Sequence, residues 1–180
     1  MPRHPLLPPP SAEARAHSEQ LTRLIADEIA RAGWIDFARY MELALYAPGL
    51  GYYSAGAAKF SAEGDFVTAP EIVPLFSRTL AQQVAQLLRL TGDEVIELGA
   101  GSGRMALDML RELRKLDALP TRYSIVEVSG DLRERQRARL LDLPPELRSR
   151  VHWLDTIPGE LTGVVLANEV LDALPVHIVA

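Results

Sequence analysis

The sequence has no cysteine and no long apolar run, and both absences narrow the chemistry open to its 180 residues. Without cysteine the chain forms no disulfide, no thiolate zinc site and no cysteine nucleophile. No segment approaches the roughly 18 consecutive apolar residues of a transmembrane helix. We therefore expect no membrane insertion, and any chemistry must come from other side chains.

Acidic residues outnumber basic ones by 24 to 19, so the formal net charge is -5. This balance gives no general electrostatic attraction for nucleic acid. Arg133, Arg135, Arg137 and Arg139 alternate along one segment interrupted by Glu134, which predicts a solvated helix face and no nucleic-acid partner. No metal-ligand spacing connects the four histidines, so we predict no metal site. These histidines are His4, His17, His152 and His177.

The first part of the chain predicts helices behind a flexible tail. Residues 1–17 are rich in proline and are expected to form that tail. Ser18 is a suitable cap for a helix that Gly33 ends, and a second helix is expected from about Asp36 until Pro48 stops it. With 48% hydrophobic residues the chain suits one packed domain of ordinary size.

A glycine-rich stretch without a sustained period follows over residues 49–71. Loops of this length inside compact domains are usually functional or disordered, and the aromatic residues of this one argue against disorder. A longer helix is expected from Pro74 to about Leu90. The sequence therefore predicts a helical region over residues 18–90 that contains a glycine-rich loop.

From residue 91 the pattern changes to alternating strands and helices. Strands are expected at Glu94–Leu98, Tyr123–Val128, Val151–Leu154 and Gly163–Asn168, with the start of a fifth over Val176–Ala180. The expected helices are Arg104–Leu116, Asp131–Leu141 and a brief one from Glu169. This alternation predicts an α/β fold with a Rossmann-like parallel sheet, covered on both faces, over residues 91–180. Ligands bind such sheets at the carboxyl ends of the strands.

The turn after the first expected strand carries the most specific signal. Gly99, Gly101 and Gly103 form a G-x-G-x-G pattern preceded by Glu97. A P-loop would need a lysine and a hydroxyl residue after the last glycine, and a dinucleotide fingerprint would need a third glycine where Arg104 stands. A carboxylate two residues before the first glycine suits an ammonium group better than a pyrophosphate.

S-adenosylmethionine matches this turn because it carries an ammonium and a sulfonium and has no phosphate. Glu127, at the end of the second strand, is placed to accept hydrogen bonds from two ribose hydroxyls. Asp155 follows the third strand, where it could hold the adenine amino group, and its neighbour Trp153 is expected in the core. We predict S-adenosylmethionine as the cofactor and keep a nicotinamide cofactor as the alternative.

Four motifs in order make the resemblance to a known family specific. They are "MELALYAPGLGYYS", "GDFVTAPEIVPLF", "VIELGAGSGRMALDML" and "ANEVLDALPVHIV". Together they resemble the MidA-type methyltransferases, a family that includes the mitochondrial arginine methyltransferase needed for respiratory complex I assembly. Ser61 and Ser77 depart from the glycines expected there.

The resemblance implies a class I methyltransferase fold, S-adenosylmethionine as the cofactor and, in eukaryotes, a protein arginine as the substrate. The implied partner is a substrate protein, which in eukaryotes could be a respiratory complex subunit. The implied location is the cytoplasm for a bacterial protein and the mitochondrial matrix for a eukaryotic one.

Arginine methylation needs carboxylates, because a guanidinium with a pKa above about 12 is a poor nucleophile. Glu169 and Asp172 follow the fourth strand and would share one face of a helical turn, so with Asn168 they are the candidate catalytic residues. They could instead cap that helix. Asp65, Thr68 and Glu71 in the glycine-rich loop are expected to close over the cofactor as a lid, or to form turns and cap the next helix.

The resembling family continues beyond residue 180, so we expect this sequence to be the amino-terminal part of a longer enzyme. A sheet of only four to five strands would expose an apolar face and an unpaired edge, which favours self-association. Two other functions stay open at this point. One is a non-catalytic assembly module built on a truncated methyltransferase fold, and the other is an NAD-dependent oxidoreductase half-domain.

Overall fold

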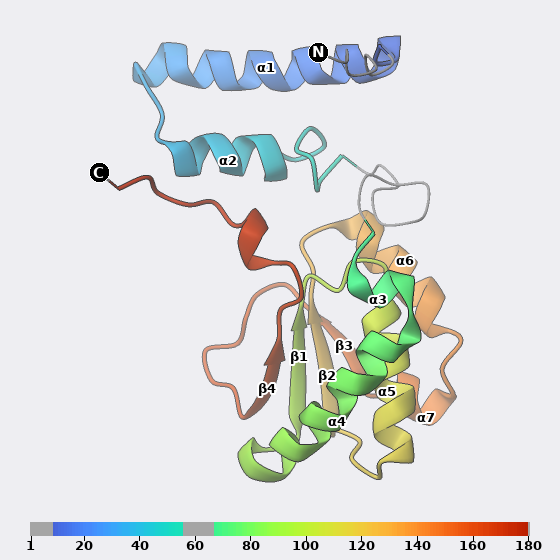
Figure 1. The fold of residues 1–180 in the computed structure, drawn as a ribbon. Coiled ribbons are helices and arrows are strands. Elements are labelled where there is room, and N and C mark those ends of the chain that lie inside the picture. Colours follow the sequence, from blue (N-terminus) through green and yellow to red (C-terminus); the bar gives the residue numbers. More distant parts are fainter. Residues whose placement is uncertain (1–8, 56–66, 180) are drawn as a thin grey trace, which may run out of the picture. The chain divides into compact units, whose positions relative to one another are not determined.

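The computed structural model describes residues 9–55 and 67–179, which divide into two compact units (Figure 1). The first unit combines Met1–Ala55 with Leu174–Ala180, and the second is Gly56–Ala173. None of the helices within the described ranges has the length and apolar composition that crossing a bilayer requires.

The helical unit begins earlier than the sequence predicts. Helix α1 spans Ala12–Ala32, and Ser11 caps it by accepting a hydrogen bond from the Ala14 backbone N–H at 3.0 Å. The expectation of a flexible tail up to residue 17 is therefore wrong from Ala12 onward, because good helix formers follow a capping serine there. Gly33 ends the helix as expected, with its φ at +83°.

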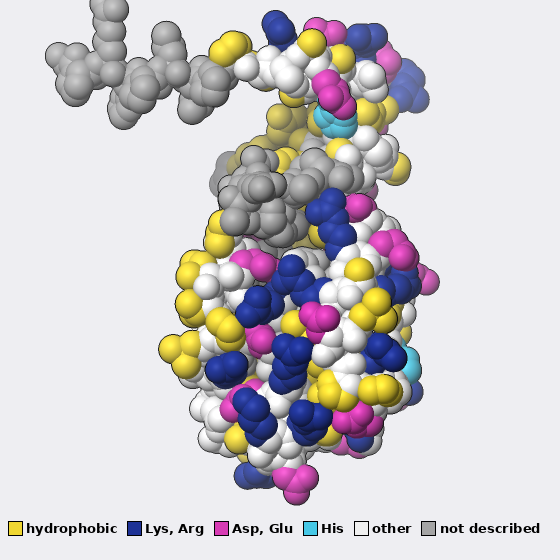
Figure 2. All heavy atoms as spheres, turned by 90° about the vertical axis from the view of Figure 1, so that its right-hand side faces the viewer, with side chains coloured by type: hydrophobic (Ala, Val, Ile, Leu, Met, Phe, Trp, Pro, Cys, Tyr) yellow, Lys and Arg dark blue, Asp and Glu magenta, His cyan; other side chains and the backbone are white. Residues whose placement is uncertain are grey.

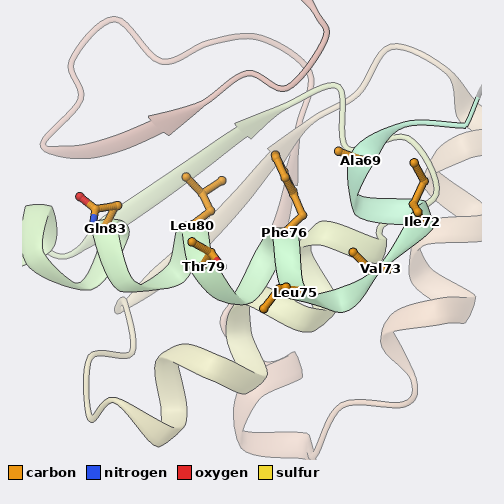
Figure 3. Close-up of a pocket in the computed structure, with 8 residues that line it drawn as sticks. All are labelled: Ala69, Ile72, Val73, Leu75, Phe76, Thr79, Leu80 and Gln83. Atoms are coloured by element: carbon orange, nitrogen blue, oxygen red, sulfur yellow. The ribbon is translucent and has the colours of Figure 1, made fainter.

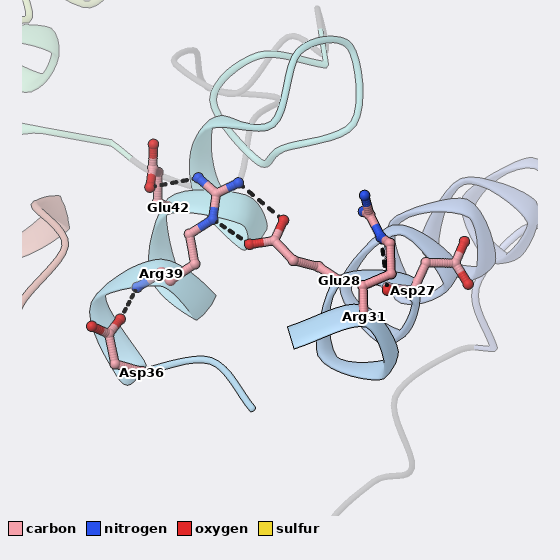
Figure 4. A network of polar contacts seen from close by, with 6 residues as sticks. All are labelled: Asp27, Glu28, Arg31, Asp36, Arg39 and Glu42. Carbon is pink, nitrogen blue, oxygen red and sulfur yellow. Dashed lines mark hydrogen bonds and ion pairs between the residues drawn. The ribbon is translucent and has the colours of Figure 1, made fainter. Parts of the chain in front are cut away.

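Helix α2 (Phe37–Tyr46) is joined to α1 by a guanidinium fork (Figure 4). Arg39 donates from Nε to Glu28 Oε1 at 2.6 Å and from Nη2 to Glu28 Oε2 at 3.0 Å, and its Nη1 donates to Glu42 Oε2 at 2.7 Å. The hydrogen bond from Arg39 lowers the pKa of Glu28. Asp36 caps α2 as expected by accepting from the Arg39 backbone N–H.

The second unit is built on four parallel strands, which confirms the predicted α/β fold. The strands are β1 (Glu94–Leu98), β2 (Arg122–Val126), β3 (Val151–Leu154) and β4 (Gly163–Leu166). Their order in the sheet is β3-β2-β1-β4. The chain moves outward from β1 to β3 and then returns to the other side of β1 for β4. The strand order therefore reverses beside β1, where α/β sheets bind ligands.

Helices cover one side of this sheet in Figure 1. They are α4 (Pro74–Thr91), α5 (Arg104–Lys115), α6 (Gly130–Leu140) and the short α7 (Pro145–Arg148). Their apolar faces enclose a core with the strands; among its members are Val84, Val95, Met109, Leu113, Tyr123 and Ile125. The expectation of helices on both faces is met on one face only within the described residues, and Val165 of the edge strand β4 is 48% exposed.

The expected fifth strand is not present in the described part of the chain. Residues 175–179 have no regular secondary structure, and Ile178 and Val179 are exposed. A strand exists only when a neighbour satisfies its backbone hydrogen bonds, and no further described strand pairs with β4. The apolar pattern of this segment indicated a strand, but an apolar pattern does not show whether a neighbouring strand is there to accept its backbone hydrogen bonds.

Candidate functional site

The glycine turn between β1 and α5 requires its three glycines. Gly99, Gly101 and Gly103 have φ values of +60°, +53° and +79°, a region that L side chains rarely adopt. Space is also short, because a Cβ on Gly99 would lie 3.2 Å from Val170 Cγ2 and one on Gly103 would lie 3.3 Å from Gln136 Cα. The G-x-G-x-G pattern therefore reflects a tight left-handed turn at the carboxyl end of β1.

Glu97 lies immediately before this turn and is 1% exposed. Its Oε2 accepts a hydrogen bond from the Tyr123 hydroxyl on β2 at 2.6 Å. Burial raises the pKa of Glu97 to about 7; the Tyr123 hydrogen bond opposes this rise and the charge of Glu127 adds to it. A buried carboxyl in this state gains much from a cationic partner. Tyr123 was not singled out from the sequence, where it reads only as an apolar strand residue.

Glu127 follows β2 and is 6% exposed. Its Oε1 accepts from the Ser129 backbone N–H at 3.0 Å, and its Oε2 accepts from Gln136 Nε2 at 3.1 Å. Burial raises the pKa of Glu127, and these two hydrogen bonds act against the rise. A carboxylate has about four acceptor positions, so Glu127 keeps the capacity to accept a hydrogen bond from a ligand hydroxyl.

Glu97, the glycine turn and Glu127 are thus brought together at the carboxyl ends of two neighbouring strands. The Gly99 backbone N–H donates to the Val126 carbonyl at 2.9 Å, which ties the turn to the end of β2. Gln136 also joins the two, as its Nε2 donates to the Gly101 carbonyl at 2.9 Å. Sequence reasoning missed Gln136, although its spacing from Leu132 and Leu140 marks the inward face of α6.

The arginines of α6 are only partly a solvated face. Figure 2 shows Lys and Arg side chains interleaved with Asp and Glu over the helices of this unit. Arg135 and Arg137 fit the prediction, since they pair with Asp131 and Glu134 at the surface. Arg133 does not fit it: its side chain is 20% exposed and donates to the carbonyls of Glu127 and Leu154. An arginine with such backbone partners buttresses the ends of β2 and β3.

Arg139 is the second exception, and it serves the glycine turn. Its Nη1 donates to Ser102 Oγ at 3.0 Å, and the Ser102 hydroxyl donates to Glu71. Glu71 belongs to the short helix α3 (Ala69–Ile72), which this contact holds against the turn. Thr68 occupies the N-cap position of α3 without a side-chain capping bond. Asp65, the other predicted lid residue, lies outside the described residues.

The predicted catalytic residues follow β4 but do not share a helical face. Glu169 has a φ of +51°, and only a three-residue 3-10 helix, Leu171–Ala173, follows it. The expectation that Glu169 and Asp172 lie on one helical turn is therefore wrong, because left-handed backbone at Glu169 cannot continue a helix. Asn168 Nδ2 contacts Glu169 Oε1 at 3.5 Å. The segment nevertheless lies beside the glycine turn, since a Cβ on Gly99 would meet Val170 Cγ2.

Asp155 lies farther toward the surface than Glu97 and Glu127. Its side chain is 89% exposed, and Oδ1 is 2.8 Å from Arg133 Nη1. Trp153 packs against the core as expected and also donates from Nε1 to Gln136 Oε1 at 2.9 Å. The adenine side of the predicted site is thus more open than its ribose side.

An apolar hollow of about 510 Å³ lies on α3 and α4 (Figure 3). Its lining consists of Ala69, Ile72, Val73, Leu75, Phe76, Thr79, Leu80 and Gln83. Because no titratable side chain lines it, the chemistry belongs to the polar turn. Over residues 9–55 and 67–179 no three histidine, aspartate or glutamate side chains cluster as metal ligands would.

Comparison with known proteins agrees with this geometry. Residues 79–180 match a family described as "Putative S-adenosyl-L-methionine-dependent methyltransferase". A crystal structure of a COG1565 superfamily member from Burkholderia thailandensis, bound to S-adenosyl-homocysteine, is 51% identical with a TM-score of 0.87. This match covers 94% of the present chain and 45% of that one. A native crystal structure of a superfamily protein from the same organism is 50% identical, with a TM-score of 0.83 over 95% of this chain and 44% of that one.

Curated relatives include the mitochondrial protein arginine methyltransferase NDUFAF7 homologs of Caenorhabditis elegans and Drosophila melanogaster. Each is 31% identical. The matches cover 96% and 94% of this chain and 46% and 44% of those proteins. The present chain therefore spans about half the length of the relatives that it matches.

S-adenosylmethionine is the cofactor of this family, and the residues of the turn fit it. The buried Glu97 carboxyl suits an ammonium group, and the free acceptor positions of Glu127 suit a ribose diol. No lysine follows the glycines, as a triphosphate would require. From its matched residues, its sheet and this turn, the chain belongs to the MidA-type family of S-adenosylmethionine-dependent methyltransferases.

Proposed function

We propose that this protein transfers a methyl group from S-adenosylmethionine to the side chain of a protein arginine. One observation carries the cofactor half of the proposal: two buried carboxyls, Glu97 and Glu127, lie beside a glycine turn. The acceptor half is supported by the names of relatives at about 30% identity, which are called protein arginine methyltransferases. Because the chain spans about half of those relatives, the proposal concerns the activity of the whole protein.

The cofactor site divides its tasks between the two carboxyls. Bound S-adenosylmethionine supplies an electrophilic methyl group on a sulfonium. Glu97, held by the Tyr123 hydroxyl, pairs with the ammonium group, and Glu127 orients the ribose hydroxyls. The left-handed glycine turn lets the backbone approach the ligand without side chains in the way. Together these contacts fix the direction in which the methyl group is presented.

The acceptor residues come from the segment after β4. A guanidinium keeps its proton at neutral pH, so it needs carboxylates that orient it and accept a proton as the new N–C bond forms. Glu169 and Asp172 are exposed carboxyls on the segment whose Val170 lies beside Gly99, and Asn168 precedes them. We assign these three residues to the binding and deprotonation of the arginine.

Methylation of arginine-containing peptides tests this assignment. In the full-length protein, Glu169→Gln combined with Asp172→Asn should reduce transfer at least about a hundredfold, in line with the loss of a general base. Cofactor affinity should stay within about twofold. Glu160→Gln, an exposed change in the loop before β4, is the control. Wild-type transfer by the double variant, or transfer to lysine in place of arginine, would remove the acceptor assignment and leave the cofactor site standing.

A further inference from the structure

Gln136 is a buried amide that contacts three parts of the cofactor site. It lies on α6 and is 0% exposed. Its Nε2 donates to the Gly101 carbonyl at 2.9 Å and to Glu127 Oε2 at 3.1 Å, while its Oε1 accepts from Trp153 Nε1 at 2.9 Å. A primary amide has two N–H donors and one carbonyl oxygen, so both donors and the acceptor are engaged.

Trp153 determines which way this amide points. An indole nitrogen only donates, so it holds the amide oxygen toward β3 and leaves the NH₂ group toward the turn and Glu127. The Arg137 guanidinium lies over the Trp153 ring, 4.9 Å from its centroid, and supports the indole. Gly103 adds a steric limit, since a Cβ there would lie 3.3 Å from Gln136 Cα and Cγ. The amide is therefore fixed in place and in orientation.

Two groups at the predicted cofactor site depend on this amide. A trans peptide places its C=O and N–H on opposite sides, so holding the Gly101 carbonyl toward α6 turns the Ser102 N–H away from it. The second hydrogen bond fixes one oxygen of Glu127, whose other oxygen is fixed by Ser129. One side chain thus holds the turn and the ribose carboxylate in register.

We propose that Gln136 is a positioning residue of the cofactor site, oriented by Trp153, which makes the glycine turn and Glu127 one preorganised unit. The inference rests on the proposed function, because it assumes that Glu127 accepts the ribose hydroxyls. Gln136 itself touches no ligand in this account. It acts through the Gly101 carbonyl and Glu127.

Calorimetric titration of the protein with S-adenosylhomocysteine and with its 2′-deoxy analogue tests this role. Gln136→Leu keeps most of the side-chain volume and removes both donors and the acceptor. Loss of a hydrogen bond to a charged group should weaken S-adenosylhomocysteine binding by about ten- to a hundredfold. Because Oε2 of Glu127 is no longer held, the preference for the ribose ligand over its 2′-deoxy analogue should shrink.

Leu140→Met is the matched control, since Leu140 is buried on the same helix face one turn later. This volume-conserving change should alter neither the affinity nor the preference. Trp153→Phe is the second test variant, because it removes the N–H that orients the amide, together with one ring of the indole, and keeps an aromatic ring beneath Arg137. Like Gln136→Leu, it should weaken S-adenosylhomocysteine binding and reduce the preference over the 2′-deoxy analogue, each by about three- to tenfold. If Gln136→Leu does not fold, Trp153→Phe still tests the positioning role.

The two proposals fail in different ways. If folded Gln136→Leu and Trp153→Phe lose thermal stability but keep the wild-type affinity and preference, Gln136 is a packing residue and the positioning role is wrong. If both ligands weaken equally, Gln136 does not act through Glu127 and the inference is again wrong. A wild-type protein that does not bind S-adenosylhomocysteine would overturn the proposed function, and this inference with it, before any variant is compared.

Discussion

The hydroxyl of Tyr123 donates to the buried carboxyl of Glu97 at 2.6 Å, across the neighbouring strands β2 and β1. In the strand register Val95 lies opposite Tyr123 and Glu97 opposite Ile125, so the pair is diagonal on one face of the sheet. Tyr123 is fully buried, and burial and the Glu97 charge both raise the pKa of its hydroxyl. The hydroxyl therefore stays a donor over the accessible pH range and holds Glu97 in one position.

This arrangement predicts how stability depends on pH. The pKa of Glu97 rises from its ordinary 4.5 to about 7 in the folded chain, so the folded state binds this proton more tightly than the unfolded state. The free energy of unfolding should therefore fall by roughly 3 kcal/mol as pH rises from about 4.5 to about 7. Above pH 7 this group should cause no further change. Urea unfolding at pH 5 and pH 8 measures the change.

Glu97→Gln should remove that component, because a glutamine keeps the acceptor for Tyr123 and has no charge to bury. The variant should lose less stability between pH 5 and pH 8 than the wild type does. Glu94→Gln, on the same strand but partly exposed, should follow the wild-type curve. An unchanged slope in Glu97→Gln would show that the carboxyl is not buried in the folded protein.

Cofactor binding should have the opposite pH dependence. The α-amino group of the cofactor, with a pKa near 8, stays protonated below pH 7. The ion pair between this ammonium and Glu97 therefore forms only when Glu97 is ionised. The affinity for S-adenosylmethionine should rise by up to about tenfold per pH unit between pH 5.5 and pH 7. Calorimetric titration across this range provides the measurement, and Glu97→Gln should bind weakly at every pH. A pH-independent affinity in the wild type would show that Glu97 does not bind the ammonium.

Two glycines of the same unit offer a matched pair of substitutions. Gly103→Ala places a Cβ at a φ of +79° and 3.3 Å from Gln136, so it should weaken cofactor binding at least about tenfold and cost about 1–2 kcal/mol of stability. Gly159→Ala places a Cβ in open space and should change neither. Equal effects of both substitutions on affinity and melting temperature would mean that the turn does not need its left-handed backbone.

The sequence predicts the features that depend on local pattern. The bounds of β1 and β3 agree with prediction, because apolar residues there are bounded by turn residues. The turn at Gly99, Gly101 and Gly103 follows from glycine spacing, and the structure adds that its backbone is left-handed. The position of Glu127 at the end of a strand predicts that it binds the cofactor, and its burial agrees with a role inside the site.

Features that depend on tertiary partners are not predictable in this way. Tyr123 and Gln136 are ordinary strand and helix residues until the fold brings them to Glu97 and Gly101. The sequence pattern predicts that Arg133 and Arg139 are solvated. In the structure Arg133 donates a hydrogen bond to the Glu127 carbonyl after β2, and Arg139 donates one to Ser102. The helical turn expected to contain Glu169 and Asp172 is absent for a related reason, since the left-handed backbone at Glu169 is not encoded in the spacing of these carboxylates.

The most direct test of the account is a parallel calorimetric titration of the protein with S-adenosylmethionine and with NADH. We predict saturable binding of S-adenosylmethionine only, and its loss in Glu127→Ala, because Glu97 and Glu127 frame a turn that favours an ammonium and a ribose over a pyrophosphate. Binding of NADH in competition with S-adenosylmethionine, or full affinity for S-adenosylmethionine in Glu127→Ala, would contradict the site as described.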